Sequence, residues 1–308
     1  MSDKSEIIED PNGFFTVKDK PSPNKLEGHY EKLYKEFDNN SKIRKNYQES
    51  YNEQEVKHIN LLNDLCLHSL EVYNSNWIKN PGKMLEVGVG EGFFLNRVKE
   101  KGWNIHGIDF NLNGVEKFNP QLSSVIETGD AFKILKQVKL KNQAYDVCVI
   151  QNVLEHVLDP KQLLLDLSQI LSNDGIIVVK VPNDFSRIQL RVKELGFIEE
   201  QFWVVPPEHL NYFNTENFRI FMRNIEFNII DMYSTFPIDF YLFHEGSNYI
   251  KNSNQGKMAH HARTEIDLIL SESGMDNYYK LCQSLATCNV GRNITVLIKP
   301  KNKVQRLV

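Results

Sequence analysis

Short apolar runs alternate with amphipathic stretches between residues 83 and 181. Apolar runs bounded by glycine, proline and polar residues are typical of buried strands, and apolar residues at intervals of three and four are typical of helices. The predicted strands are 83–87, 104–109, 124–127, 145–150 and 176–181, and the predicted helices are 93–101, 111–118 and 159–171. This alternation favours an α/β fold with a doubly wound parallel sheet. Later runs at 226–235 and 293–299 predict a sixth and a seventh strand.

The limits of this pattern divide the chain into four parts. Residues 1–80 form a tail, whose opening residues are expected to be disordered, and a helical leader. Residues 81–235 form the core, which carries an insertion at 182–213. Residues 236–292 form a second insertion, predicted to be a lid or a substrate subdomain because a structureless loop of that length is improbable. Residues 293–308 hold the last strand and a tail.

The first strand runs into closely spaced glycines, in the pattern Glu86-x-Gly88-x-Gly90-x-Gly92. Such glycines allow a sharp strand-to-helix turn and a close approach of a ligand to the backbone. A dinucleotide-binding turn has its third glycine one residue later and places a pyrophosphate on the helix N-terminus. Here the carboxylate of Glu86 would repel a pyrophosphate and would suit the ammonium group of an amino acid. A dinucleotide site and a purely structural turn are the alternatives.

A second acid follows at the end of the second strand. Asp109 lies about 20 residues after the glycine turn, where nucleotide-binding α/β folds place the carboxylate that accepts two ribose hydroxyls. The alternative role for Asp109 is to cap the next helix.

The glycine turn resembles the first motif of class I S-adenosylmethionine (SAM)-dependent methyltransferases. The resemblance implies SAM as the cofactor and a Rossmann-like, seven-stranded methyltransferase sheet. It also implies that Asp130 accepts a hydrogen bond from the adenine amino group, while Ala131 and Phe132 hold the ring. An N-cap on a short helix is the alternative for Asp130. Tyr30 and Tyr34 in the leader are candidates for closing over the cofactor.

The run 145–157 resembles the fourth motif of small-molecule methyltransferases, which ends in Glu-His-Val. Under this resemblance Gln151 and Asn152 line the methionine part of SAM. Glu155 and His156 have two open interpretations: they hold the turn together through hydrogen bonds, or they take part in catalysis.

A second Glu-His pair stands on a rigid turn after Pro206-Pro207, among aromatic residues. The run from Glu208 to Phe213 resembles the Glu-His-Leu-x-Tyr-Phe segment found after the fifth strand in many methyltransferases, including sugar C-methyltransferases. His209 is the predicted general base, with Glu208 orienting or charging it, and with Tyr212 and His156 as secondary candidates. This chain lacks the cysteine-rich zinc module of the sugar C-methyltransferases, which weakens the transfer of their reaction.

The composition excludes several other classes. The 308 residues carry a net charge of −4 without long basic runs, so no broad surface for nucleic acid is expected. No segment has the apolar length that crossing a membrane requires, and a cytoplasmic location is predicted. The four cysteines form no C-x-x-C pair, and His260 and His261 point apart on a helix, so no metal site is predicted.

The predicted function is transfer of a methyl group to a hydroxyl of a polar small molecule. The first candidate for this acceptor is a nucleotide-linked or surface-glycan sugar of polysaccharide biosynthesis. Arg187 and Arg191 lie one helical turn apart, where they form a solvated face or grip a phosphate or carboxylate of the substrate. The alternatives are a C-methyltransferase acting on a sugar nucleotide, a dinucleotide-dependent oxidoreductase, and a SAM-binding protein without catalysis. The oligomeric state is open.

Overall fold

The computed structural model describes residues 6–26, 28–29 and 50–301. Seven strands form one sheet in the order β5-β4-β3-β6-β7-β10-β9. The first five strands in this order run parallel, and β10 runs antiparallel to β7 and β9. The strands are β3 Lys83–Val87, β4 Asn104–Asp109, β5 Ile126–Thr128, β6 Tyr145–Gln151, β7 Leu171–Pro182, β9 Phe227–Ser234 and β10 Asn293–Pro300. The predicted doubly wound, Rossmann-like sheet is therefore confirmed, and the strand order reverses between β3 and β6, where such folds bind ligands.

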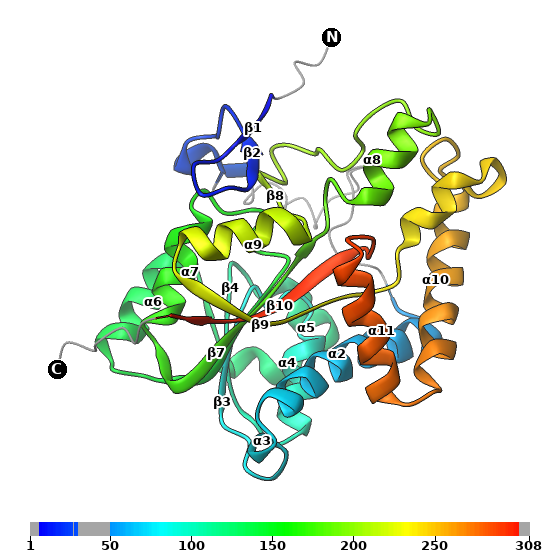
Figure 1. The fold of residues 1–308 in the computed structure, drawn as a ribbon. Helices are drawn as coiled ribbons and strands as arrows, with labels where there is room; N and C mark the ends of the chain where they lie inside the picture. The colour runs from blue at the N-terminus through cyan, green and yellow to red at the C-terminus, as the bar shows by residue number, and fades with distance from the viewer. Residues whose placement is uncertain (1–5, 27, 30–49, 302–308) are drawn as a thin grey trace.

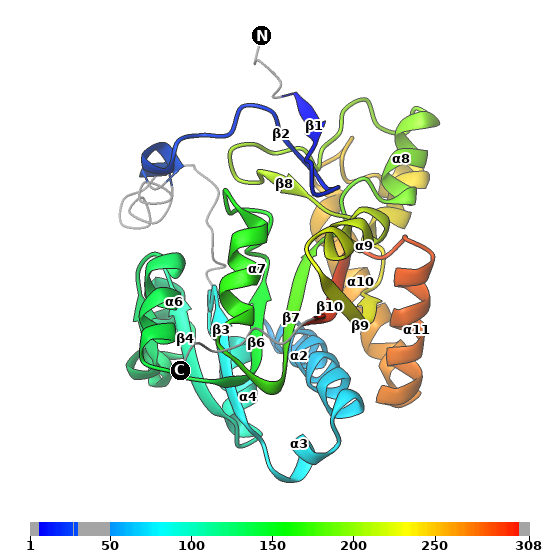
Figure 2. The ribbon, with the colours of Figure 1, turned by 60° about the vertical axis from the view of Figure 1, so that its left-hand side comes forward.

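Helices cover both faces of the sheet, because neighbouring strand residues point to opposite sides (Figure 1, Figure 2). Leu85 and Cys148 belong to the core cluster covered by α6, α7 and α9. Met84 and Val147 point the other way, into the cluster covered by α2, α4 and α11. The helices are α2 Glu53–Tyr73, α3 Asn76–Lys79, α4 Phe93–Glu100, α5 Asn113–Phe118, α6 Ala131–Leu140, α7 Pro160–Ser168, α8 Arg187–Glu194, α9 Thr215–Asn224, α10 Gln255–Ser271 and α11 Met275–Thr287.

A second, smaller sheet ties the start of the chain to the segment that carries His209. It consists of β1 Ile7–Glu9, β2 Phe15–Val17 and β8 Asn211–Tyr212, with β2 in the middle. The expectation of disorder in the opening residues is wrong from residue 7 onwards, because this hairpin finds strand partners far along the chain. Tyr30 and Tyr34 lie outside the described residues.

The region 236–292 packs closely against the core. It contains two short 3-10 helices, η3 Ile238–Phe243 and η4 Glu245–Ser247, followed by α10 and α11, which lie side by side (Figure 2). The buried carboxylate of Asp267 on α10 lies 2.8 Å from His58 Nε2 on α2 and accepts the hydroxyl hydrogen of Tyr278 on α11 at 2.7 Å. This network joins the region to the helical leader. Whether the region acts as a lid stays a prediction.

Several predicted boundaries are corrected by the structure. Helix α7 ends at Ser168 and not at Leu171, because Leu171 is already paired with Tyr145 as the start of β7. The third strand is shifted to Ile126–Thr128, since Pro120–Val125 forms a 3-10 helix. Helices α10 and α11 were not among the predicted elements given above.

Candidate active site

A cavity of about 370 Å³ lies at the carboxyl ends of the central strands, over the glycine turn. Its walls come from the turn itself, from the ends of β3, β6 and β7, and from one face each of α2 and α10. The lining includes the predicted cofactor residues Glu86, Gly88, Gly90, Gly92, Gln151 and Asn152. The structure therefore brings these six residues together around one space.

The glycine turn has a shape that other residues would not adopt without strain. Gly88, Gly90 and Gly92 all have positive φ angles, of 81°, 60° and 81°. A Cβ on Gly88 would lie 2.3 Å from the side chain of Val153, whereas a Cβ on Gly90 would meet nothing within 4 Å. Gly92 is the N-cap of α4. The turn is thus packed tightly beneath Gly88 and open to the cavity at Gly90.

Glu86 is buried at the floor of this cavity. Its Oε1 accepts a long hydrogen bond of 3.4 Å from Gln151 Nε2, and its Oε2 has no hydrogen-bond partner among the described residues. Burial, and then the nearby charge of Asp109, raise the pKa of Glu86 well above its usual range. A buried carboxylate oxygen without a donor favours a ligand that brings one, such as an ammonium group.

Asp109 and Asp130 both have backbone partners. Asp109 Oδ2 accepts the N–H of Gly90 at 2.8 Å, so this carboxylate holds the glycine turn closed. Burial raises its pKa despite that hydrogen bond. Asp130 is the N-cap of α6, where it accepts the N–H of Lys133 at 2.8 Å. The alternative capping role is therefore present at Asp130, while Ala131 and Phe132 are half-buried beside it.

Two cations that line the cavity were not singled out from the sequence. Lys180 comes from β7 and Arg263 from α10, and burial is the largest cause lowering the pKa of each. Arg263 Nη2 lies 3.1 Å from His260 Nδ1, and its Nε has no partner among the described residues. Lys180 had one sequence signal, its place inside a buried strand where a charge is costly. Arg263 had no such signal.

The helical leader also contributes to this cavity through residues of α2 and the segment before it. Tyr51 donates to Glu91 Oε2 at 2.5 Å and packs edge-on against Phe93 and Phe118. His58 lines the same space from α2. The leader thus closes one side of the glycine turn, at positions later in the chain than the sequence indicated.

A second cavity, of about 380 Å³, lies just beyond the end of β7. Lys180 lines the first cavity and Pro182 the second, so the two spaces follow one another along the same strand. The wall of the second cavity combines aromatic and apolar side chains with ionisable ones: Phe202, Trp203, Val205, Ile238 and Tyr249, and Asp184, Glu208, His209 and Arg292.

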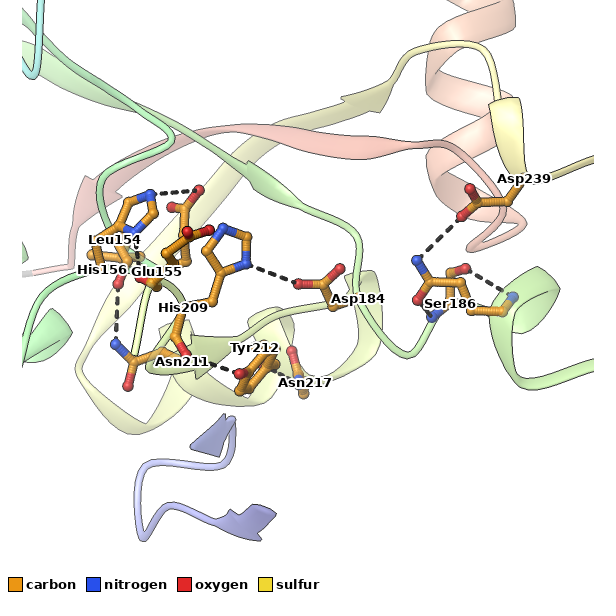
Figure 3. Close-up of polar contacts among 12 residues, drawn as sticks. Leu154, Glu155, His156, Asp184, Ser186, His209, Asn211, Tyr212, Asn217 and Asp239 are labelled. Atoms are coloured by element: carbon orange, nitrogen blue, oxygen red, sulfur yellow. Dashed lines mark hydrogen bonds and ion pairs between the residues drawn. The ribbon is translucent and has the colours of Figure 1, made fainter. Parts of the chain in front are cut away.

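Glu155, His156 and His209 converge between the strand ends and this second cavity (Figure 3). One donor atom from each of the three residues lies within 4.8 Å of the others. His156 Nδ1 lies 2.5 Å from the carbonyl oxygen of Glu208, and His156 Nε2 lies 3.8 Å from Glu155 Oε1. The two imidazole rings meet edge-on, with centroids 4.9 Å apart. We call these three residues the histidine cluster.

The acid beside His209 is Asp184 and not Glu208. His209 Nδ1 lies 3.9 Å from Asp184 Oδ2, whereas the contact that Glu208 makes with the histidine cluster is through its backbone carbonyl. The role predicted for Glu208 in orienting or charging His209 stays a prediction. Asp184 follows the buried strand β7 by two residues, and an acid at that position is the signal that sequence reasoning missed.

Burial strongly perturbs the acids and histidines of this region. It raises the pKa of Glu155 to about 8 and that of Asp184 to about 7. Burial, together with His156 and Arg292, lowers the pKa of His209 to about 3, and burial also lowers the pKa of His156. Clustered shifts of this size are typical of functional sites.

Tyr212 does not face the cavity. Its ring is fully buried, and its hydroxyl donates to the carbonyl oxygen of His209 at 2.8 Å. Its neighbour Asn211 donates to the carbonyls of Leu154 and Val157, on either side of the Glu155-His156 pair. The segment after the double proline is therefore fastened to the end of β6 by its own polar side chains (Figure 3).

Arg187 and Arg191 stand apart from both cavities. Arg187 is exposed, and Arg191 is paired with Glu194 at 2.7 Å on the surface of α8. Of the two interpretations given for these arginines, a solvated helix face is the one that matches their positions. None of the helices within the described ranges has both the length and the apolar character needed to cross a bilayer.

The parallel sheet, the glycine turn and the acid at its base define an α/β enzyme of the class I methyltransferase type. A family model described as a methyltransferase domain matches residues 61–231, which is more than half of the 308 residues. The chain belongs to this family of SAM-dependent methyltransferases, and its cofactor is SAM.

Individual relatives are distant. A ubiquinone biosynthesis O-methyltransferase of Rickettsia canadensis (strain McKiel) is 27% identical over 158 residues, which are 47% of this chain and 58% of the relative. The enzyme of the same name from Actinobacillus pleuropneumoniae serotype 7 (strain AP76) is 25% identical over 189 residues, covering 56% of this chain and 80% of the relative. Thus the chain spans a little over half the length of the first of these relatives.

Solved structures with a similar arrangement are also remote in sequence. A SAM-dependent methyltransferase from Clostridium acetobutylicum ATCC 824 is 12% identical, with a TM-score of 0.48 over 91% of this chain and 99% of that one. Coclaurine N-methyltransferase, bound to N-methylheliamine and S-adenosylhomocysteine (SAH), is 14% identical, with a TM-score of 0.47 over 91% of this chain and 88% of that one.

Proposed function

We propose that this chain transfers a methyl group from SAM in the first cavity to a hydroxyl of a ring-bearing small molecule in the second. The observation that carries the proposal is the arrangement of the two cavities along β7, with His209 of the histidine cluster in the wall of the second. A methyl donor and an acceptor must meet in line, and two adjoining cavities supply that alignment.

An acid and two cations line the first cavity, as the two charges of an amino acid require. Glu86 would receive the ammonium group of SAM, and Arg263 and Lys180 would receive its carboxylate. Gln151 and Asn152 extend the same wall along the methionine chain. The buried, unpaired oxygen of Glu86 and the buried, unpaired Nε of Arg263 are the groups that such a zwitterion would satisfy.

The nucleoside would follow the edge of the sheet away from Glu86. Asp109 would accept from the ribose through its second oxygen while the first holds Gly90. Asp130 would accept from the adenine amino group and still cap α6, because a carboxylate has more than one acceptor site. Ala131 and Phe132 would pack on the ring.

The chain's own task is to place the acceptor hydroxyl and take its proton, since bound SAM supplies an already activated methyl group. His209 is the proposed proton acceptor, with Asp184 beside its Nδ1 in place of Glu208. Tyr212 is a positioning residue, because its hydroxyl holds the backbone carbonyl of His209. His156 is held by the carbonyl of Glu208 and faces Glu155.

The acceptor proposed for the second cavity has a flat ring. Phe202, Trp203 and Tyr249 form much of the wall, and aromatic side chains pack well on planar groups. A phenol fits this wall best. The sugar hydroxyl expected from the sequence is the second candidate. Glu208 and Arg292 support it, because both line the cavity and their side chains can form hydrogen bonds with the hydroxyls of a sugar ring.

Titration calorimetry with SAH and NAD tests the cofactor, and a panel of phenols, catechols and sugar nucleotides with SAM tests the acceptor. We expect SAH to bind, NAD not to bind, and a phenolic product to gain one methyl group by mass spectrometry. The product's methyl chemical shift separates O-methylation from C-methylation. His209→Ala should retain SAH affinity and lose turnover; unchanged turnover would remove His209 from the mechanism.

A further inference from the structure

The histidine cluster contains more unpaired polar atoms than a buried hydrogen-bond network tolerates. Both carboxylate oxygens of Glu155, Asp184 Oδ2 and His209 Nδ1 are buried, and none has a hydrogen-bond partner among the described residues. Glu155 is 1% exposed and Asp184 is 2% exposed. Asp184 Oδ2 and His209 Nδ1 face each other at 3.9 Å, but buried polar atoms normally have partners, so the two oxygens of Glu155 call for a group that the described part of the chain does not supply.

We propose that the histidine cluster is a binding site for one divalent transition-metal ion, held by Glu155, His156 and His209. The inference rests on the proposed function for its chemical use, but not for its existence, because it is drawn from the donor atoms alone. One carboxylate and two imidazoles are a common ligand set for zinc and for ferrous ions.

The two histidines already have the orientation that a metal ligand needs. In His156, Nδ1 faces the carbonyl oxygen of Glu208 at 2.5 Å, so Nδ1 carries the hydrogen and Nε2 presents its lone pair towards Glu155. In His209, Nδ1 faces Asp184, and the other ring nitrogen points towards Glu155 (Figure 3). Metal-binding histidines typically donate their second N–H to a carbonyl or carboxylate in this way.

The separations fit an ion after a small closure. Donor atoms about 2.0–2.2 Å from an ion lie roughly 3.5 Å from each other. The three donor atoms are at present within 4.8 Å of one another, and Glu155 Oε1 is 3.8 Å from His156 Nε2. A shift of about 1 Å by the Glu155 carboxylate, whose oxygens have no hydrogen-bond partner among the described residues, would narrow this gap and leave the contacts of the two imidazoles in place.

The ion would have an open coordination position at the second cavity. His209 and Asp184 line that cavity, and Glu155 lies behind them. An ion held by three protein ligands can bind the oxygen of the acceptor and lower the pKa of its hydroxyl. His209 would then act as a ligand in place of the proton acceptor, and the hydroxyl proton would leave to solvent as its oxygen binds the ion, which deepens the proposed function by naming how the hydroxyl is activated.

Metal titration of the purified full chain, stripped with a chelator, tests the site. We expect one equivalent of Zn²⁺ to bind at micromolar concentration or tighter by calorimetry, and Co²⁺ to give visible absorption bands typical of nitrogen ligation. Glu155→Gln and His209→Asn should each weaken Zn²⁺ binding at least tenfold and abolish the Co²⁺ bands. Asp184→Asn should weaken binding about tenfold, as loss of an outer partner does.

His261→Ala is the matched control, because this histidine is exposed on α10 and lies outside the cluster. It should bind Zn²⁺ as the unmodified chain does. SAH affinity and the thermal unfolding midpoint of each variant establish that it is folded. A chain that binds SAH but binds no Zn²⁺, or binds it equally after Glu155→Gln, overturns the metal site and leaves the proposed function standing. A chain that binds Zn²⁺ but not SAH supports the metal site and overturns the proposed function.

Discussion

The two halves of the candidate active site are built in different ways. The cofactor side depends on a turn whose residues, from Glu86 to Gly92, are neighbours in the sequence. The acceptor side brings together Glu155 and His156, Asp184 and His209 from three separate segments. The first is specified by local backbone geometry, and the second exists only once the chain has folded.

This contrast explains why the two sides respond differently to substitution. A turn of three glycines with positive φ fails when one Cβ is added, because both its conformation and its packing are fixed. The histidine cluster depends on polar partners, so an isosteric change can remove chemistry there and leave the fold intact. The predictions below test this separation, from the largest expected effect to the smallest.

Gly88→Ala should damage both folding and cofactor binding. The new Cβ would lie 2.3 Å from Val153, on a backbone with φ of 81°, so we expect a loss of about 2–4 kcal/mol in the free energy of unfolding. SAH binding should fall below detection. Gly256→Ala, where a Cβ meets nothing within 4 Å, serves as the control. Denaturant unfolding and calorimetry measure both effects, and equal stability of the two variants would contradict the account of the turn.

Glu86→Gln should separate cofactor binding from stability. The folded chain retains the proton of Glu86 at pH values where the unfolded chain loses it, because burial raises the pKa of the folded carboxyl. The stability that comes from holding this proton is therefore fully present below about pH 4.3, the pKa of the Glu86 carboxyl in the unfolded chain. It falls as the pH rises towards the pKa of the same carboxyl in the folded chain. We expect Glu86→Gln to be more stable than the unmodified chain at pH 7, equally stable near pH 4, and at least tenfold weaker in SAH binding.

The control for this change is Glu116→Gln, an exposed acid in the first turn of α5. It should alter neither the pH dependence of unfolding nor SAH affinity. Thermal unfolding measured from pH 4 to pH 8 gives the comparison. If Glu86→Gln lowers stability at pH 7, Glu86 is a stabilising partner in the folded chain and the buried-charge argument fails.

Asp184→Asn and Glu208→Gln should differ, although the sequence placed Glu208 next to the predicted base. Asp184 faces His209, so its replacement should lower kcat about tenfold to a hundredfold. The side chain of Glu208 makes no hydrogen bond or ion pair with the described part of the chain, so Glu208→Gln should change kcat less than threefold. SAH affinity should stay constant in both. A larger effect for Glu208→Gln would restore the pairing expected from the sequence.

The smallest effect is expected in the N-terminal hairpin. The hydroxyl of Thr16 lies 2.9 Å from the carbonyl oxygen of Leu210 and 3.0 Å from Asn211 Oδ1, and it is buried. Thr16→Val should cost about 1 kcal/mol of unfolding free energy. Thr16→Ser, which keeps the hydroxyl, should lose less. SAH binding should be unchanged in both, and a loss of SAH affinity would show that the two sides of the site are coupled.

The sequence predicted the fold and the floor of the cofactor cavity because both depend on local patterns. Strand β4 has the predicted bounds, Asn104–Asp109, and Asp159, where the helix 159–171 was predicted to begin, is the N-cap of α7. Where the predictions erred, tertiary pairing decided the outcome. Ile170 and Leu171 continue the helical spacing of α7, yet Leu171 joins β7 because Tyr145 offers a strand partner.

The candidate site follows the same rule. Glu86 could be found from its place in the glycine turn, whereas Arg263 enters the cofactor cavity only because α10 packs on α2. Nothing in the sequence distinguished Asp184 from other acids. It lies beside His209 because β7 and the segment 202–213 come together in the fold. Arg187 and Arg191 had suitable spacing, but their helix presents them to solvent.

The pairing of β2 with β8 has a consequence for how the chain is made. Thr16 and Leu210 are 194 positions apart, so β2 must wait until β8 has been synthesised before the two can pair. Closing such a long loop costs only slightly more entropy than closing a loop of half its length, but it takes place late. The glycine turn, Asp109 and Asp130 all precede residue 180, whereas Asp184, His209 and the cavity-lining residues of α10 follow it, so the groups proposed to hold the nucleoside are made before those proposed to act on the acceptor.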